Sequence, residues 1–213
     1  MPRITAEKRE ANRARIVAAA RRCFSRDGFH QTSVPDIAAE AGLAVGALYR
    51  YFGGKDEIIL EIAGDAFRML FAPVERLIST SRNVTVADLV STAIDPVAAG
   101  ASGGETEYAV PDDELLRCAV QAWGELLRSE ALRQHAESGF EQVRRQIADA
   151  LRAGQKTGST PAALDPDRGA RVVMALLHGF VLQRTAFGLE DMAGFARDAR
   201  LMLGDAGLPQ QGH

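Results

Sequence analysis

Apolar residues recur at helical spacing along most of the chain, and the first clear stripe lies within residues 7–26. Its members are Ile16, Ala20, Cys23 and Phe24. These positions are spaced i, i+4, i+7 and i+8, so they share one face of a helix. The Asp27-Gly28 pair that follows ends the pattern, because glycine readily takes the left-handed conformation found after helix C-termini. The sequence therefore predicts a long amphipathic first helix.

Two short helices, residues 34–41 and 45–52, are predicted next, with only a tight turn between them. Ser33 is the expected N-cap of the first, and Asp36 three residues later is its capping-box partner. Gly42 follows the first helix as a left-handed C-cap. Two short helices joined by a glycine-containing turn form a helix-turn-helix, whose second helix enters the major groove of DNA.

The remaining apolar periodicity predicts six more helices. They cover residues 56–79, 85–99, 113–128, 130–156, 167–187 and 190–203. Ala and Leu are abundant and only 6% of residues are aromatic, which favours helices over strands. We therefore expect an all-α protein of nine helices. Residues 1–54 are expected to form a helix-turn-helix DNA-binding domain, and residues 55–213 a ligand-binding and dimerisation domain.

Charge is distributed unevenly along the chain. Residues 1–55 carry ten Lys/Arg and five Asp/Glu, whereas the remaining residues carry fifteen and twenty-three. A basic N-terminal part on an acidic remainder favours a polyanionic partner for the first part. Solvated helix charges that cluster by chance are the alternative, so charge alone does not decide for nucleic acid.

The predicted helix over residues 45–52 carries side chains suited to DNA. Leu48 and Phe52 are spaced i, i+4 and are expected to face the core. Small side chains elsewhere allow close approach to DNA, and long polar ones reach phosphates or base edges. The small residues are Gly46 and Ala47, and the long ones are Tyr49, Arg50 and Tyr51. Lys55 begins the next helix, where amides and a cation together bind phosphate. The alternative for both tyrosines is packing within the domain.

Residues Ile16 to Ile58, 43 consecutive positions, resemble the DNA-binding domain of TetR-family transcriptional repressors. The matching residues are Phe24, Gly28-Phe29, Thr32-Ser33, Ile37-Ala38, Ala41-Gly42, Gly46-Ala47-Leu48-Tyr49, Tyr51-Phe52 and Lys55. The resemblance implies a cytoplasmic homodimer that binds a palindromic operator and is released by a small-molecule effector. By the same likeness, phosphate contacts would come from Ser33, Tyr49, Tyr51 and Lys55, and base contacts from Val45, Gly46, Ala47 and Arg50.

The chain departs from the family pattern at the start of this helix. Ala44 and Val45 stand where family members often carry Ser or Thr and Lys, respectively. The helix therefore lacks a side-chain cap and one usual contact. Base recognition is expected to depend on Arg50, on apolar contacts from Val45 and Ala47 to thymine methyl groups, and on DNA shape.

The C-terminal domain is expected to hold the effector between its helices, where ligand sites of helical proteins occur. The predicted contacts are Phe67, Leu70, Phe71, Trp123, Leu126, Phe140, Met174 and His178, with Gln121 as a second polar candidate. None of them is Lys or Arg, so a lipophilic or aromatic, largely uncharged effector is expected. The alternative for each residue is ordinary core packing, and a core or pocket position is favoured over metal ligation for His178.

The run "VVMALLHGFVL", residues 172–182, is apolar on nearly every face, whereas a surface helix needs only one apolar face. We therefore expect the last two helices to form the dimer interface. The predicted interface residues are Val173, Leu177, Phe180, Phe195, Ala199 and Met202.

The sequence offers little for catalysis. We find no catalytic nucleophile motif, no glycine-rich phosphate-binding loop and no residues at metal-ligand spacing. We therefore expect no enzyme activity, cofactor or metal. Cys23 and Cys118 fit buried apolar positions in a reducing cytoplasm. The charged N-terminus is no secretory signal, and no apolar run reaches bilayer length. The alternative function is a helical protein-interaction module with a non-functional helix-turn-helix.

Overall fold

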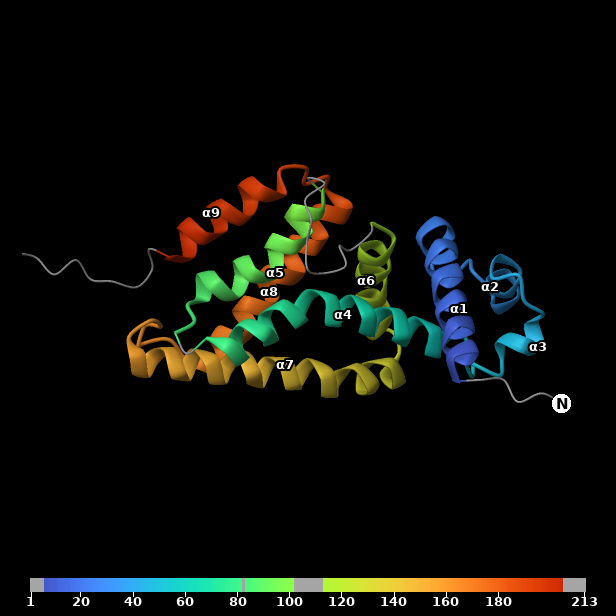
Figure 1. Cartoon of the computed structure of the whole chain (residues 1–213), viewed down its shortest axis with the longest axis horizontal. Coiled ribbons are helices and arrows are strands. Elements are labelled where there is room, and N and C mark those ends of the chain that lie inside the picture. Colours follow the sequence, from blue (N-terminus) through green and yellow to red (C-terminus); the bar gives the residue numbers. More distant parts are fainter. Residues whose placement is uncertain (1–5, 82, 102–112, 205–213) are drawn as a thin grey trace, which may run out of the picture. The chain divides into compact units, whose positions relative to one another are not determined.

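The computed structural model describes residues 6–81, 83–101 and 113–204. These residues form nine α-helices and no strands (Figure 1), which confirms the predicted all-α fold. The helices are α1 (Ala6–Asp27), α2 (Val34–Glu40), α3 (Val45–Leu48), α4 (Lys55–Thr80), α5 (Val86–Ala101), α6 (Asp113–Leu126), α7 (Glu130–Thr157), α8 (Pro166–Ala186) and α9 (Met192–Gly204).

One helix is clearly shorter than its pattern predicted. The α-helical part of α3 ends at Leu48 rather than near Phe52. The backbone continues in tighter turns, in which the Tyr51 amide donates to the Leu48 carbonyl at 2.8 Å and the Arg50 amide to the Ala47 carbonyl at 3.3 Å. These i→i+3 bonds are typical of 3₁₀ turns at helix ends. Leu48 and Phe52 still lie in the core, as predicted.

The helices divide into two compact units. The first contains α1, α2, α3, residues 55–67 of α4, α6 and residues 130–136 of α7. The second contains the rest of α4, α5, residues 137–157 of α7, α8 and α9. The division into functional domains after residue 54 stays a prediction.

The core of the first unit is built around α1. Its predicted stripe is buried, and the Phe24 ring meets the Phe29 ring edge-on, with 4.6 Å between centroids. Ile37 of α2 and Leu48 of α3 are fully buried, as are Ile58 and Ile62 of α4. Burial of this apolar surface is what holds the two short helices in place, because helices of four and seven residues have no stability of their own.

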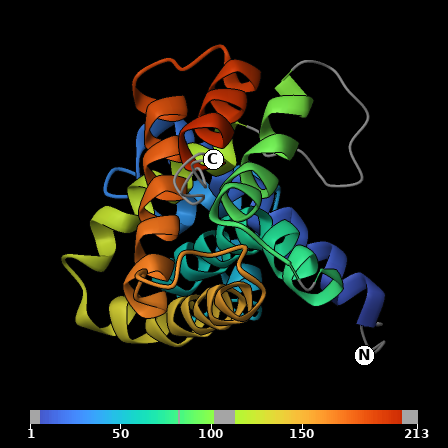
Figure 2. The same cartoon turned by 90° about the vertical axis from the view of Figure 1, so that its left-hand side faces the viewer.

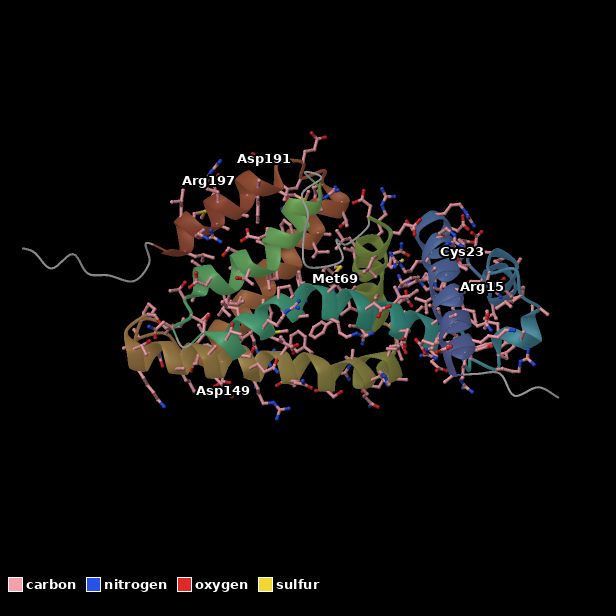
Figure 3. All side chains as sticks on the ribbon, in the orientation of Figure 1. Arg15, Cys23, Met69, Asp149, Asp191 and Arg197 are labelled. Atoms are coloured by element: carbon pink, nitrogen blue, oxygen red, sulfur yellow. The ribbon has the colours of Figure 1, made fainter. Side chains whose placement is uncertain are left out.

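In the second unit, α5 packs against α9 and α8 (Figures 1 and 2). Buried residues of this unit include Phe71, Leu89, Ile94, Val173, Met174, Leu177 and Phe180. The Phe180 ring lies 5.4 Å from the Phe195 ring. Arg197 of α9 lies on the outer side of the helix, away from α5 (Figure 3).

Among the residues that the structure describes, no helix combines the length and the apolar character that a bilayer-spanning segment needs.

Candidate nucleic-acid interface

The turn between α2 and α3 gives the helix-turn-helix its geometry. Gly42 has φ +63°, a conformation that residues with a Cβ adopt only with strain. The Leu43 amide donates to the Ala38 carbonyl at 2.9 Å, which closes the end of α2. Chain direction therefore changes within a few residues, and α3 begins at Val45.

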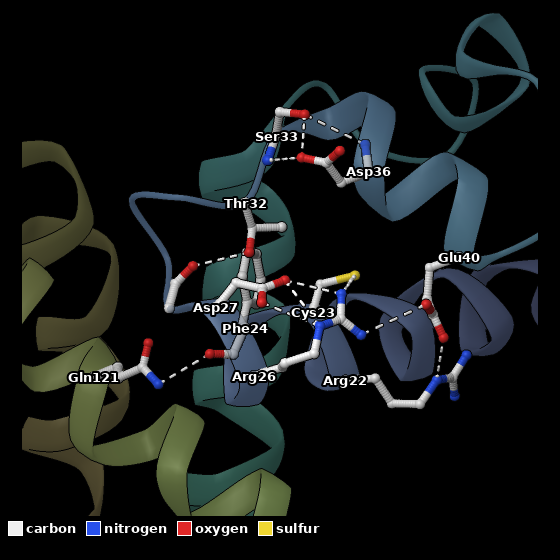
Figure 4. Close-up of polar contacts among 11 residues, drawn as sticks. Arg22, Cys23, Phe24, Arg26, Asp27, Thr32, Ser33, Asp36, Glu40 and Gln121 are labelled. Atoms are coloured by element: carbon white, nitrogen blue, oxygen red, sulfur yellow. Dashed lines mark hydrogen bonds and ion pairs between the residues drawn. The ribbon is translucent and has the colours of Figure 1, made fainter.

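A complete capping box begins α2, as the sequence predicted (Figure 4). The Asp36 amide donates to Ser33 Oγ at 3.3 Å, and the Ser33 amide donates to Asp36 Oδ2 at 2.8 Å. The Ser33 hydroxyl also donates to Asp36 Oδ2 at 2.5 Å. Hydrogen bonds from Ser33 lower the pKa of the Asp36 carboxyl. The hydroxyl proton of Ser33 is thus used within the cap.

The outer face of the α3 segment carries most of the predicted DNA-contacting residues. Ala44, Val45, Gly46, Tyr49 and Arg50 are exposed, and Ala47 is half-buried. No side chain caps Ala44, which agrees with the missing Ser or Thr. This face combines apolar atoms, one phenol and one guanidinium, which is a set that can contact thymine methyl groups, phosphates and guanine edges.

Tyr51 is placed differently from Tyr49. Tyr49 is 53% exposed, whereas Tyr51 is half-buried and its hydroxyl accepts from Asn12 Nδ2 at 2.9 Å. The Tyr51 carbonyl accepts from Arg13 Nη1 at 3.2 Å. Arg13 also lies 4.3 Å from the Phe52 ring centre. Tyr51 therefore connects the α3 segment to α1, the packing role that the sequence left open.

Lys55 is engaged inside the unit. Its Nζ donates to the Phe29 carbonyl at 2.8 Å and to the Thr32 carbonyl at 3.2 Å. Both acceptors belong to the turn between α1 and α2. An ammonium group has three N–H donors, so one remains for a phosphate. At the start of α4, the Gly53 amide already donates to Glu57 Oε2 at 2.6 Å.

The basic surface of α1 is partly neutralised by ion pairs. Arg22 Nε lies 2.7 Å from Glu40 Oε1, and Arg26 Nη2 lies 2.8 Å from Asp27 Oδ2 (Figure 4). Arg15 is exposed on the same helix (Figure 3). Burial raises the pKa of the Cys23 thiol, so this group stays protonated near neutral pH. Neither cysteine forms a disulfide.

The predicted effector contacts are distributed over both units. Phe67, Trp123 and Leu126 belong to the first, and Leu70, Phe71, Phe140, Met174 and His178 to the second. Within the second unit, the His178 ring stacks on Phe140 with 6.4 Å between centroids and meets Phe71 edge-on at 6.3 Å. Burial lowers the pKa of His178. The Gln121 amide group donates to the Phe24 carbonyl of α1 and accepts from the Phe29 amide in the turn after α1, so both of its polar atoms are already engaged.

The predicted dimer contacts differ in how far they are buried within the chain. Val173, Leu177 and Phe180 are at most 1% exposed within the single chain, so these side chains belong to its own core. Phe195 and Ala199 are half-buried, and Met202 is 80% exposed. Val172 and Leu176 on α8 are exposed apolar residues that were not among the predicted interface residues. Because the run is apolar on every face, its sequence has no periodicity that shows which face is exposed.

Comparison with known proteins identifies the class. A DNA-binding helix-turn-helix joined to a helical C-terminal part is the architecture of bacterial one-component regulators. Residues 16–62 match the family model described as bacterial regulatory proteins, tetR family, and residues 108–200 match that of the BetI-type transcriptional repressor, C-terminal. The chain belongs to the TetR family of transcriptional regulators, and its relatives are regulators rather than enzymes.

Individual relatives are similar over nearly the whole chain. The uncharacterized HTH-type transcriptional regulator YfiR of Bacillus subtilis is 25% identical over 95% of both chains. The structure of Salmonella enterica GusR has a TM-score of 0.73 at 21% identity, covering 95% of this chain and 97% of GusR. A SmeT–triclosan complex has a TM-score of 0.65 at 26% identity, covering 94% and 96%.

Substituting Lys55 by Met tests whether this side chain supports the fold of the first unit. The change removes two charge-assisted hydrogen bonds, so we expect the free energy of unfolding to fall by about 1–2 kcal/mol. Chemical denaturation measures this. Lys156→Met, at an exposed position near the end of α7, is the matched control and should leave stability unchanged. Equal stability of both variants would show that the two hydrogen bonds of Lys55 do not support the fold.

Proposed function

We propose that this protein is a one-component repressor that binds a palindromic operator as a homodimer and leaves it when a small effector binds. The observation that carries the proposal is the exposed face of the α3 segment, held by a buried core and presented by a helix-turn-helix. Membership of the TetR family supports each part of it. Purified protein should retain a defined set of genomic fragments, with affinity that falls steeply as salt rises. Failure to retain any fragment would overturn the proposal.

In this proposal, Arg50 is the main base-reading side chain. It is exposed, and it is the sole charged residue within residues 45–52. A guanidinium binds guanine O6 and N7 with two parallel hydrogen bonds. Val45 and Ala47 add apolar contacts, and Tyr49 is placed to reach phosphate.

Arg50→Ala should weaken binding to the operator more than binding to a scrambled duplex of the same length. One bidentate base contact contributes about 1–3 kcal/mol, or roughly 5- to 150-fold in the ratio of the two dissociation constants. Arg50→Lys keeps the charge and loses the bidentate geometry, so it should lose specificity yet keep nonspecific affinity. Equal losses on both duplexes would make Arg50 a phosphate contact.

The homodimer interface in this proposal is the outer face of α8 and α9. Val172 is 56% exposed, Leu176 40%, Leu201 61% and Met202 80%. Exposed apolar side chains on α8 and α9 favour association with another protein surface. A two-fold interface presents the same patch on both protomers, as a palindromic operator requires.

Leu176→Glu should convert the dimer to monomers and weaken operator binding, because a buried carboxylate would face its symmetry mate across the interface. Sedimentation at micromolar concentration measures the first effect and a gel shift the second. The matched control is Leu127→Glu, at a residue that is 90% exposed in the first unit. A monomeric wild type would refute the dimer, and a dimeric Leu176→Glu variant would place the interface elsewhere.

The effector in this proposal is uncharged and lipophilic or aromatic, and it binds at the cluster of Phe71, Phe140 and His178. Rings dominate this cluster, and the lowered pKa keeps His178 neutral at pH 7. A charged ligand would find no fixed counter-charge among these side chains. The related SmeT structure contains triclosan, an uncharged aromatic probe.

Triclosan should raise the thermal midpoint of this protein and lower its operator affinity, whereas the small cation choline should do neither. Ligand binding to the folded state alone raises stability with concentration. Phe140→Ala should reduce the triclosan shift, and Phe187→Ala, at a residue that is 70% exposed, should not. A shift with choline instead of triclosan would show that the ligand class is wrong.

A further inference from the structure

The turn between α1 and α2 is held by side chains from two distant helices. Gly28, with φ +82°, ends α1, and residues 29–32 lead to the Ser33 cap of α2. Inside the turn, the Thr32 hydroxyl donates to the Gly28 carbonyl at 2.9 Å. The other partners of this turn come from α4 and α6.

Gln121 of α6 contacts both sides of this turn. Its Nε2 donates to the Phe24 carbonyl at 3.1 Å (Figure 4), and its Oε1 accepts from the Phe29 amide at 3.2 Å. A carboxamide has a donor and an acceptor at the same end, whereas an ionised carboxylate has no donor and an ammonium no acceptor. The glutamine amide group can therefore make both bonds at once, and asparagine lacks one methylene of reach.

Phe29 joins α6 to α4 through its own backbone. Its N–H is bound by Gln121, and its carbonyl accepts from Lys55 Nζ at 2.8 Å. The Phe29 ring is 4% exposed and packs on Phe24. Because both backbone groups and the ring of Phe29 have partners, we expect a displacement of Gln121 to move the turn that leads into α2.

Other contacts of the turn and α1 with α6 and the residues just after it are weaker. His30 Nε2 lies 3.0 Å from Glu125 Oε1 and 2.6 Å from Arg128 Nη1, but the His30 side chain is 62% exposed. Exposed polar pairs contribute little because water competes for them. Cys118 Sγ lies 3.8 Å from the Arg21 carbonyl, at the limit for a sulfur hydrogen bond. Gln121, half-buried and bonded twice, is the contact that couples α6 to the turn.

We propose that Gln121 is a positioning residue that couples α6 to the helix-turn-helix through the backbone of Phe29. Operator binding and the state of α6 are then linked, and linkage between two sites acts in both directions. This inference rests on the proposed DNA-binding function. It assigns a specific residue to the connection between α6 and the DNA-contacting helices.

Trp123 provides a reporter that needs no effector. It is the only tryptophan and lies two residues from Gln121 on α6. Titration of the wild type with an operator duplex should change Trp123 emission as the gel shift saturates, and a scrambled duplex at equal concentration corrects for direct quenching. Gln121→Met has similar volume and no hydrogen bonds to offer. We expect it to reduce the emission change at least twofold in DNA-bound protein.

Gln134→Met is the matched control, because Gln134 is exposed and bonds only within its own helix, to Glu130 at 2.8 Å. It should keep the full emission change. An unchanged emission response in Gln121→Met, with the operator bound, would overturn the coupling while leaving DNA binding intact. Absence of any gel shift in the wild type would instead refute the DNA-binding function and, with it, this inference.

Hydrogen exchange on the wild type covers the case in which Gln121→Met does not fold. Operator binding should slow exchange together in peptides that span residues 28–33 and residues 113–126. Protection that is confined to residues 28–48, with no change in α6, would overturn the proposal.

Discussion

The first unit depends on satisfying the backbone groups between α1 and α2. Each partly buried amide or carbonyl left without a partner costs about 1–3 kcal/mol. Here the partners are side chains far away in the sequence, since Phe29 is bonded by Lys55 and Gln121. Packing of α4 and α6 beside the turn therefore stabilises it, which couples the folding of α2 and α3 to those two elements.

The same dependence extends to the α3 segment. With four α-helical residues, α3 has almost no helical stability of its own. Its position is set by the buried side chains of Leu48 and Phe52 and by contacts from α1 to Tyr51. Because the inner face and the backbone are fixed by the core, the outer residues present a preorganised surface, and little ordering entropy is lost when DNA binds.

Local chemistry explains which parts could be predicted from the sequence. The Ser33 cap and the Gly42 turn each depend on residues that are only a few positions apart. A short stretch of sequence is therefore enough to predict them. Helix α4 continues through Pro73, and there the strong apolar period outweighed the proline. The length of α3 was not predictable, because tertiary contacts decide between an α-turn and a 3₁₀ turn.

Long-range contacts and burial determine the features that could not be predicted from the sequence. Lys55 resembles a family phosphate contact in sequence, and only the folded turn reveals its two carbonyl partners. In α8 the apolar run does not distinguish the buried residue Leu177 from the exposed residue Leu176. Which side of such a helix is buried depends on where its neighbours pack, and a single sequence carries no record of that.

Side chains from α4 and α6 meet at the turn between α1 and α2, and this arrangement suggests how a signal could pass between the units in the proposed regulator. Helices α4 and α7 each contribute residues to both units, and α6 directly precedes α7. In the proposed regulator, an effector bound in the second unit can therefore act on the first through α4 or through α7 and α6. Lys55 lies at the start of α4 and Gln121 lies on α6, and both bond to Phe29. Both routes thus end on the backbone of Phe29, four residues before Ser33, the N-cap of α2. In the proposed regulator, a shift of either helix therefore acts on the same turn.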